Sequence, residues 1–422
     1  MVMDAEKELK IYKQGAAEII SESKLKEKLI KSRKEKRPLI VKLGIDASAS
    51  AIHLGSAVPL RKLRQFQDNG HKAVFLIGDF TGMIGDPSGQ SKTRKQLTEI
   101  QVKKNTAALK KQIFKILEPR KTEIVFNSNW CKKMSFADVI KVASHYTVAQ
   151  LLQRDDFENR FKNNQPIALH EFLYPLIQGY DSVVLRADVE ICGTDQKFNC
   201  LVARALQEAY GQEPEAIIMM PILEGIGTQE KMSKSLSNYI GITESSTEMF
   251  GKTMRIVDEQ IYDYFILATA LIEEEIRKIE EKFENDPKGK KEKLAFEIVK
   301  LYHSKKEAEK AKRIFELKHG KAGRKLKKSL DKSWSREKFK KIAQKVELQK
   351  KDLKNNKIWI CRLLTLIGVA PSNSEARRLI QQKGVKIDGE VAGDINKEIP
   401  SSKEGHLLEV GSRKIFYITF KL

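Results

Sequence analysis

The chemistry of this sequence starts with a short segment between an apolar run and a predicted amphipathic helix. Residues 44–56 read GIDASASAIHLGS, with a His-x-Gly unit formed by His53 and Gly55 where the helix begins. Helix N-termini present unpaired N–H groups and a partial positive charge, which suit phosphate oxygens. His53 could donate to such an oxygen, and Gly55 would let a nucleotide approach the backbone. Alone, however, the unit favours a structural turn.

A second segment changes this interpretation. Residues 224–238 read EGIGTQEKMSKSLSN, so Lys231 and Lys234 lie on a loop rich in glycine and serine. Two ammonium groups three residues apart can both reach one polyphosphate, and a closing loop can stabilise charge that develops as a bond breaks. An incidental basic loop is the alternative, which the ordered run Lys-Met-Ser-Lys-Ser disfavours. Together the two segments predict a nucleotide site.

A third segment has polar residues at helical spacing. In HEFLYPLIQGYDSVVL, Tyr174, Gln178 and Asp181 fall at i, i+4 and i+7, so a helix places all three on one face. Polar groups on an otherwise apolar helix need partners if they are buried. An internal hydrogen-bond network would satisfy them, but the neighbouring nucleotide site favours a ligand.

Positive charge is concentrated toward the C-terminal third. The chain has 422 residues, a formal net charge of +22 and 41% hydrophobic residues, as in a globular protein of two or three domains. Residues 321–360 hold 15 Lys or Arg against 4 Asp or Glu. A basic run usually forms only a solvated surface. The more specific alternative is that this run binds RNA or DNA.

Several classes are disfavoured. No apolar run approaches the ~18 residues of a membrane span, and the charged N-terminus lacks the apolar segment of a secretory signal. The cysteines form no C-x-x-C pair and no cluster with histidine, so we expect thiols in a reducing compartment and no metal site. They are Cys131, Cys192, Cys200 and Cys361.

The elements that must position these residues alternate along the chain. PLIVKLGID, KAVFLIGDF, TEIVFNS and EAIIMMPIL read as buried strands separated by helical stretches. This repetition predicts an α/β fold, a Rossmann-like parallel sheet with ligands at the carboxyl ends of its strands. We expect a helical segment at 1–35, the catalytic domain at 36–245, an α-helical domain at 246–350 and a small α/β domain at 356–422.

The two signatures, His-x-Gly and KMSKS, resemble those of class I aminoacyl-tRNA synthetases. FLIGDFTGMIGDPSG and LYPLIQGYDS narrow the resemblance to the bacterial tyrosyl-tRNA synthetase family, and it covers nearly the whole chain. Family members usually have Pro-Thr at the positions of Ala47 and Ser48, and a second histidine at Ser56. Because the work at this site is positioning and electrostatics, we expect rearranged ATP contacts there and retained chemistry.

The resemblance implies a role for each matching residue. Asp181 would accept the phenolic hydroxyl of tyrosine, and Tyr174 and Gln178 would hold its ammonium group. The other tyrosine-binding residues implied are Asp86 and Gln196. The implied ATP-binding residues are Asp46, Ser48, Gly55, Gly193, Asp195 and Lys234. The implied catalytic residues are His53, Ser56, Lys231 and Lys234. Mg²⁺ is expected to arrive with the ATP.

The C-terminal segment GVAPSNSEARRLIQQKGVKIDGE resembles an S4-type RNA-binding domain. A Ser-x-x-Glu start precedes a helix with Arg377 and Arg378, and Lys383 stands before the turn that follows. Incidental basic residues in a small α/β domain are the alternative, but the basic stretch upstream favours RNA. We expect shape and phosphate contacts more than base readout, because aromatic residues are not interleaved there.

As a whole, the resemblance implies a tyrosine–tRNA ligase that uses ATP, L-tyrosine and tRNA(Tyr), acts in the cytoplasm and forms a homodimer. A second hypothesis is a synthetase-like RNA-binding protein without aminoacylation, supported by Ala47 and Ser56 and opposed by the otherwise complete set of site residues. A synthetase for another aromatic amino acid is a third, disfavoured by the polar face that ends in Asp181.

Overall fold

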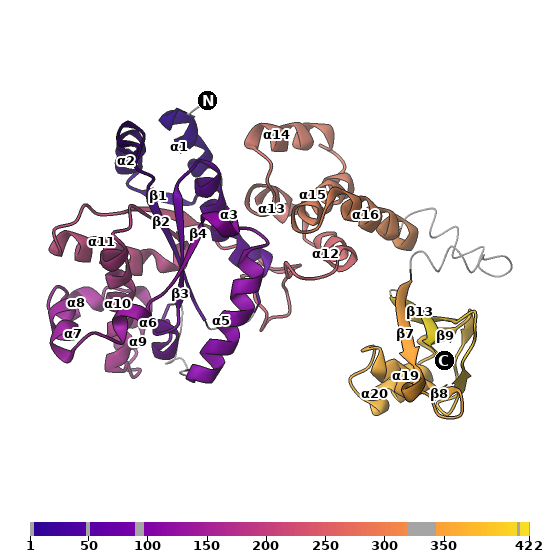
Figure 1. Ribbon diagram of the computed structural model, residues 1–422. Coiled ribbons are helices and arrows are strands. Elements are labelled where there is room, and N and C mark those ends of the chain that lie inside the picture. The colour runs from indigo at the N-terminus through magenta and orange to yellow at the C-terminus, as the bar shows by residue number, and fades with distance from the viewer. Residues whose placement is uncertain (1–3, 48–50, 89–96, 320–342, 412–413, 422) are drawn as a thin grey trace. The chain divides into compact units, whose positions relative to one another are not determined.

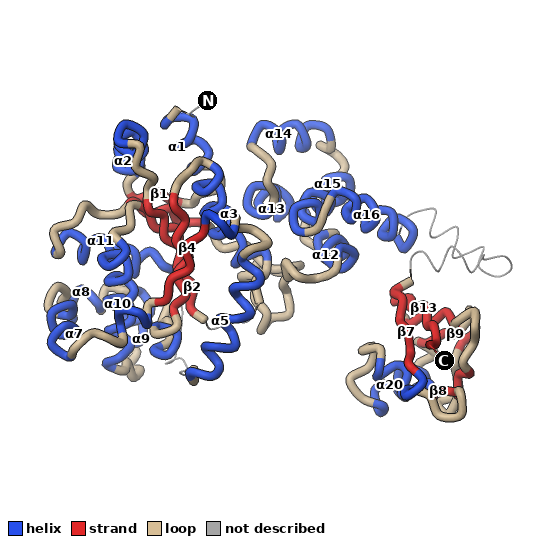
Figure 2. The backbone as a smooth tube through the Cα atoms, in the orientation of Figure 1, coloured by secondary structure: helices blue, strands red, loops and turns tan. Residues whose placement is uncertain are grey.

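The computed structural model describes residues 4–47, 51–88, 97–319, 343–411 and 414–421. The chain divides into two compact units, Met1–Lys312 and Arg313–Leu422. Figure 1 labels their elements, and Figure 2 colours them by type. Each unit has its own sheet.

The N-terminal unit is built on a six-stranded sheet in the order β1-β6-β5-β2-β3-β4. Its strands are β1 (Glu18–Ile20), β2 (Ile40–Asp46), β3 (Lys72–Gly78), β4 (Thr122–Phe126), β5 (Val189–Gly193) and β6 (Ala216–Met220). All neighbours are parallel except β1 and β6. From β2 the chain proceeds outward through β3 and β4, then returns to β5 on the other side. A topological switch point therefore lies between β2 and β5, where such sheets bind ligands.

Helices cover both sides of this sheet (Figure 1): α3 (Leu54–Asp68) and α5 (Glu99–Ile113) on one side, α10 (Leu169–Leu185) and α11 (Lys197–Ala209) on the other. Gly179 lets α10 approach α11 closely, because a Cβ there would lie 3.1 Å from the backbone of Ala203. The predicted α/β fold with a Rossmann-like parallel sheet is confirmed.

The N-terminal segment contains a strand that the sequence pattern does not predict. Between α1 (Ala5–Lys13) and α2 (Glu22–Glu35), β1 pairs with the edge strand β6. Three residues are too few to show an alternation, so tertiary pairing decides this element. Shorter helices connect the sheet to α10: α4 (Thr81–Ile84), α6 (Ser128–Cys131), α7 (Phe136–Ala143), α8 (Val148–Leu151) and α9 (Asp155–Lys162).

The stretch expected to be helical, 246–350, is helical over most of its described part and then ends in a strand. Its helices are α12 (Ser246–Thr253), α13 (Ile261–Ala268), α14 (Glu273–Lys282), α15 (Pro287–Tyr302) and α16 (Lys305–His319). The strand β7 (Gln344–Gln349) pairs with the C-terminal strand of the chain. Its lysine and glutamine content hides an alternation in which Val346 and Leu348 face the core.

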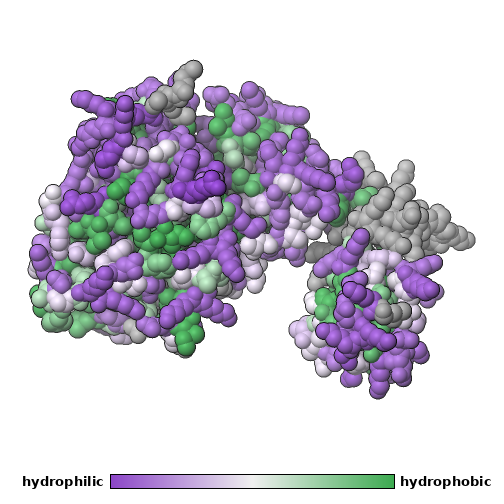
Figure 3. Space-filling view, in the orientation of Figure 1, coloured by the Kyte–Doolittle hydropathy of each residue, from purple (hydrophilic) through white to green (hydrophobic). Residues whose placement is uncertain are grey.

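In its described part, the C-terminal unit combines a five-stranded sheet with the end of α16 and with α19 (Ile360–Leu366) and α20 (Asn373–Gln381). The sheet joins β7 to β9 (Val385–Ile387), β10 (Glu390–Val391), β12 (His406–Val410) and β13 (Lys414–Lys421), while β8 (Lys357–Trp359) pairs with β11 (Glu398–Pro400). Its visible face is mostly hydrophilic in Figure 3. Within the described ranges, no helix has the length and hydropathy required to cross a membrane.

Candidate active site

One cavity at the switch point brings most of the sequence-predicted residues together. It has a volume of ≈ 440 Å³ and is lined from the ends of β2 and β5, the start of α3, one face of α10 and the loop after β6. The predicted residues that line it are Asp46, His53, Gly55, Ser56, Asp86, Tyr174, Gln178, Asp181, Gly193, Asp195, Gln196 and Lys231. Ser48 lies outside the described residues.

His53 lines this cavity as the N-cap of α3, where the sequence predicts the nucleotide end. Its Nδ1 accepts a hydrogen bond from the backbone N–H of Ser56 at 3.3 Å, so the proton of the neutral imidazole belongs on Nε2. Burial lowers the pKa of His53 to about 4, and the Lys234 ammonium adds to this effect. At neutral pH the imidazole is therefore uncharged and has an Nε2–H to donate.

Ser56 completes a capping box with His53. Its Oγ accepts the backbone N–H of His53 at 3.0 Å and donates to the carbonyl oxygen of the same residue at 3.0 Å. Both hydrogen-bonding functions of the hydroxyl thus serve the start of α3. Its predicted part in catalysis stays a prediction, although the residue lines the cavity.

The two signature segments are in direct contact. The backbone N–H of Gly55 donates to the sulfur of Met232 at 3.3 Å, and the N–H of Leu54 donates to the carbonyl of Ile240 at 2.9 Å. A Cβ at Gly55 would lie 3.2 Å from the His53 ring and 3.3 Å from Cβ of Met232, so glycine permits this approach. The lysine loop is therefore folded against the first turn of α3.

Asn238 shapes the lysine loop from within. Its Oδ1 accepts the backbone N–H of Ser233 at 2.7 Å, and its Nδ2 donates to the carbonyl of Lys231 at 3.2 Å. Lys231 lines the cavity. Lys234 is not part of the lining, but its ammonium group helps to lower the pKa of His53. Burial lowers the pKa of Lys234 itself. Both cations thus belong to the nucleotide end. The sequence pattern does not single out Asn238.

Asp181 lines the same cavity from α10 and is only 1% exposed. Its Oδ1 accepts the indole N–H of Trp130 at 2.8 Å, and its Oδ2 accepts the amide of Asn127 at 3.3 Å. Burial raises the pKa of Asp181 to about 7, a rise that the nearby Lys42 ammonium limits. Trp130 and Asn127 follow β4 and are absent from the predicted site, because no local spacing relates them to α10.

Tyr174 and Asp46 meet across the cavity. The Tyr174 hydroxyl donates to Oδ2 of Asp46 at 3.0 Å, and the Thr81 hydroxyl donates to Oδ1 of the same carboxylate at 2.7 Å. Burial raises the pKa of Tyr174, so its phenol remains a donor. Asp46 therefore links the end of β2 to the polar face of α10.

Asp86 and Gln178, both expected to hold an ammonium group, belong to one network of side chains. Tyr174, the third residue expected there, bonds to Asp46 instead. Gln196 Nε2 donates to Oδ2 of Asp86 at 2.9 Å, and the Asn199 amide donates to Gln178 Oε1 at 2.9 Å and Gln196 Oε1 at 2.8 Å. The acceptor oxygens of Asp86 and Gln178 suit a cationic amine. Asn199 was missing from the predicted set, although it lies three residues after Gln196.

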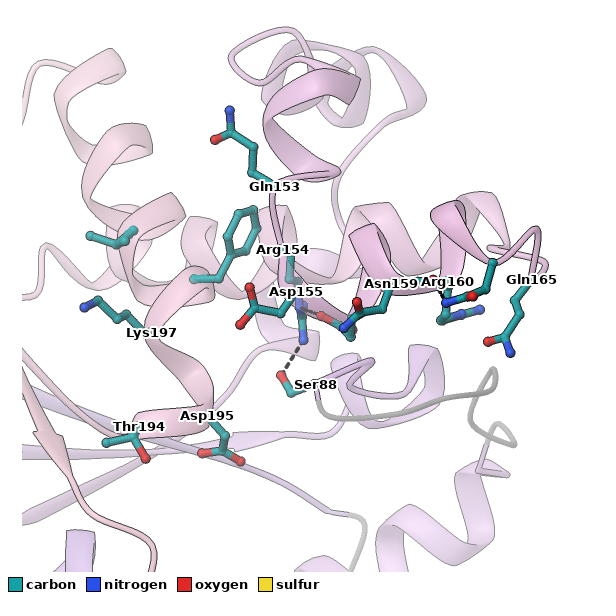
Figure 4. A pocket seen from close by; sticks show the side chains of 14 residues that line it. Ser88, Gln153, Arg154, Asp155, Asn159, Arg160, Gln165, Thr194, Asp195 and Lys197 are labelled. Atoms are coloured by element: carbon teal, nitrogen blue, oxygen red, sulfur yellow. Dashed lines mark hydrogen bonds and ion pairs between the residues drawn. The ribbon is translucent and has the colours of Figure 1, made fainter.

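A second cavity of ≈ 760 Å³ adjoins the first and shares Asp195 with it. Figure 4 shows Arg154 near its centre, with the guanidinium directed toward Ser88. Arg154 donates to Ser88 Oγ at 2.5 Å, to Asn199 Oδ1 at 3.0 Å and to Asp156 Oδ1 at 2.6 Å. The wall between the cavities is thus a set of hydrogen-bonded side chains.

Gly193 ends β5 beside this wall. A Cβ at Gly193 would lie 2.5 Å from Oδ1 of Asp195, so any larger residue would require that exposed carboxylate to move. Asp195 lines both cavities, and its contact with a ribose stays a prediction. Among the described residues, no group of three or more His, Cys, Asp or Glu side chains is placed to hold a metal ion.

The predicted RNA-binding residues belong to the C-terminal unit. Ser372 caps α20 by accepting the N–H of Glu375 at 3.3 Å. Arg377 lies over the Trp359 ring, and Arg378 pairs with Glu375 at 2.8 Å. Lys383 follows the helix with a positive φ of 56°. Contact of these side chains with RNA stays a prediction.

Comparison with known proteins defines the class. The family model for tRNA synthetases class I (W and Y) matches residues 34–318, and the S4 domain model matches residues 361–404. The chain therefore belongs to the class I tRNA synthetases of the tryptophan and tyrosine group and has an S4 domain.

Within this class, the similar proteins include tyrosine–tRNA ligases. The chain is 48% identical over 411 residues to the tyrosine–tRNA ligase of Moorella thermoacetica, covering 97% of this chain and 94% of the relative. It is 49% identical over 413 residues to tyrosine–tRNA ligase 2 of Clostridium acetobutylicum, covering 97% and 98%. The tyrosyl-tRNA synthetase of Archaeoglobus fulgidus complexed with L-tyrosine shares the fold, with a TM-score of 0.59, 21% identity and coverage of 73% and 100%.

Proposed function

We propose that this chain is a tyrosine–tRNA ligase. It would activate L-tyrosine with ATP to form tyrosyl-adenylate and then transfer the tyrosyl group to the 3′ end of tRNA(Tyr). One observation carries the proposal: Asp181 lines the same single cavity as His53 and Lys231. A bound tyrosine could therefore reach the first with its phenol and present its carboxylate near the others.

The strand β2 leaves space in the cavity for an aromatic ring. Lys42, Gly44 and Asp46 share one face of β2. A Cβ at Gly44 would meet a single neighbour, Leu76, at 3.7 Å. Space for a ring thus opens above the glycine. Asp181 would accept the phenolic hydroxyl, while Asp86 and Gln178 would hold the ammonium group.

In the activation step, a carboxylate oxygen of tyrosine would form a bond to the α-phosphorus of ATP as the bond to the bridging oxygen breaks and pyrophosphate leaves. No protein nucleophile is required. The Nε2–H of His53 and the ammonium groups of Lys231 and Lys234 would stabilise the charge on the departing phosphates. Mg²⁺ would enter with the ATP, held by its phosphate oxygens.

In the transfer step, a ribose hydroxyl at the 3′ end of the tRNA would attack the tyrosyl carbonyl, and AMP would leave. The second cavity is a suitable place for that end, because it meets the first at Asp195. Amide side chains, among them those of Gln153 and Asn159, line it (Figure 4). The S4 domain would bind the same tRNA through Arg377 and Arg378.

Exposed apolar side chains favour a homodimer. Several lie on α7 and α9 and at the start of α10. Phe136 of α7 is 80% exposed, and Leu169 of α10 is 84% exposed. Figure 3 shows apolar colour at the edge of the N-terminal unit where α7 and α8 lie. Large apolar side chains left in water are typical of a surface that a second subunit covers.

The cytoplasm is the expected site of action.

Tyrosine-dependent exchange of pyrophosphate into ATP tests the activation step, and charging of tRNA(Tyr) tests the transfer. We expect both, with phenylalanine a poor substitute for tyrosine. Exchange without tyrosine dependence would contradict the assignment. RNA binding with no exchange would instead favour the synthetase-like RNA-binding protein, a function that the similarity to ligases over nearly the full chain does not support.

A further inference from the structure

A cluster of buried charges lies beside Asp181 at the tyrosine end of the cavity. Lys42 of β2 and Glu190 of β5 are cross-strand neighbours, with Nζ of Lys42 2.9 Å from Oε1 of Glu190. Both side chains are buried, and both line the cavity together with Asp181. Lys42 also donates to Oγ of Ser182, the residue after Asp181, at 2.6 Å.

The cluster contains more acid than base. A third carboxyl group, that of Glu215, accepts from the Ser182 hydroxyl at 3.0 Å and lies within hydrogen-bonding reach of Glu190. Burial and the Glu190 carboxylate raise the pKa of Glu215 well above its usual range, which favours the neutral form of Glu215. Lys42 and Glu190 form the ion pair. The Lys42 ammonium favours the ionised form of Asp181, and the Glu190 carboxylate disfavours it.

Asp181 is arranged to be useful as a carboxylate. Both of its oxygens already accept N–H groups, from Trp130 and Asn127, and donors to both oxygens favour the ionised form. A tyrosine phenol is protonated at neutral pH, so it needs an acceptor. A protonated Asp181 would turn a donor toward the cavity and would lose the charge-assisted bond to the substrate.

We infer that Lys42 is a positioning residue for tyrosine recognition, whose ammonium group keeps Asp181 ionised, and that Glu190 moderates this effect. The inference rests on the proposed function, because it assigns the phenol of tyrosine to Asp181. Lys42 would act through Asp181 on both affinity for tyrosine and rejection of phenylalanine.

Groups from several elements face Asp181 and Lys42, and any titration reflects all of them. Within the described residues they are Glu190 of β5, Glu215 before β6, Asn127, Trp130 and Cys131 at α6, Tyr174 of α10 and Cys200 of α11. Lys42 is the cation in this set. The cysteine and tyrosine side chains are neutral near pH 7, because burial raises the pKa of Cys131 and of Tyr174.

The test is the dissociation constant of L-tyrosine measured by equilibrium dialysis from pH 5.5 to 8.5, for the wild type, Lys42→Met and Glu190→Gln. In the wild type, binding weakens as pH falls through the pKa of Asp181, about 7. Lys42→Met should move that midpoint up by about one pH unit or more, and Glu190→Gln should move it down by about half a unit. Opposite shifts distinguish control of charge from a loss of packing.

Removing one member of a buried pair risks unfolding, so the double variant Lys42→Met with Glu190→Gln is measured as well. Its midpoint should fall between those of the single variants. Asp181→Asn should abolish the titration in every background. Wild-type protein that fails to bind tyrosine would overturn the proposed function and this inference with it. Tyrosine binding whose midpoint shifts in the same direction in both single variants, or not at all, would overturn the inference alone.

Discussion

The backbone N–H of Gly55 donates to the sulfur of Met232 at 3.3 Å, which joins the first turn of α3 to the lysine loop. The two segments are separated in sequence by most of the parallel sheet, and in the proposed mechanism both contact the phosphates of ATP. Their contact in the structure would let the neutral imidazole of His53 and the two ammonium groups approach that ligand from two sides.

Lys234→Ala should slow tyrosine-dependent pyrophosphate exchange by roughly 10²–10³-fold and leave the affinity for tyrosine nearly unchanged. The reason is that Lys234 acts at the phosphate end, away from the cavity lining around Asp181. Exchange at saturating tyrosine gives the rate, and equilibrium dialysis gives the affinity. An unaltered exchange rate would remove the loop from the mechanism.

Asn238→Ala should also slow exchange, by about tenfold or more, although Asn238 touches no substrate in the proposed mechanism. Without its amide, the N–H of Ser233 and the carbonyl of Lys231 lose their partners, and the loop loses its shape. Leu236→Ala is the matched control, because Leu236 lies on the same loop and is 48% exposed. Equal rates for the two variants would show that the loop needs no such support.

Ser56→Ala should lower the free energy of unfolding by about 1 kcal/mol, the usual effect of losing an N-terminal cap contact. Both hydrogen bonds of the hydroxyl go to the backbone of His53, so the loss falls on the start of α3. Urea unfolding followed by circular dichroism measures it. A variant as stable as the wild type would mean that the capping box contributes nothing.

The polar face of α10 could be predicted because helical geometry alone decides it. Tyr174, Gln178 and Asp181 line the cavity as their spacing requires. The strands β2, β3, β4 and β6 were equally predictable, since buried parallel strands are nearly continuous apolar runs, whereas β1 and β7 were not. In both cases, the information lies within one short segment.

The partners of these residues could not be predicted in the same way. Trp130 and Asn127 are 51 and 54 residues from Asp181, and the sheet order alone brings them together. Lys42 reads in sequence as an interruption of an apolar strand, and only the pairing with β5 supplies its counter-ion. The hydroxyl of Ser56 could have been expected at a helix cap from its place three residues after His53.

Asp181→Asn should reduce the preference for tyrosine over phenylalanine in exchange by on the order of a hundredfold. Tyrosyl enzymes are themselves the known example of this kind of selectivity: a buried polar group committed to a hydroxyl is left unpaired by the analogue that lacks it. Here the acceptor would be the carboxylate held by Trp130 and Asn127. Ratios of kcat/KM for the two amino acids measure the effect, and an unchanged ratio would refute this assignment of the pocket.

Acid should destabilise the protein partly through His53. Burial lowers the pKa of His53 to about 4, whereas a histidine in an unfolded chain titrates near 6.5. Between these values the unfolded state binds a proton that the folded state does not, so this contribution is fully present above pH 6.5 and is lost as pH falls toward 4.

His53→Gln removes the difference, and its stability should fall less than that of the wild type between pH 7.5 and pH 5. Urea unfolding at the two pH values measures both losses. Equal losses would show that the imidazole is not held neutral, and the Nε2–H assigned to ATP would then need another explanation.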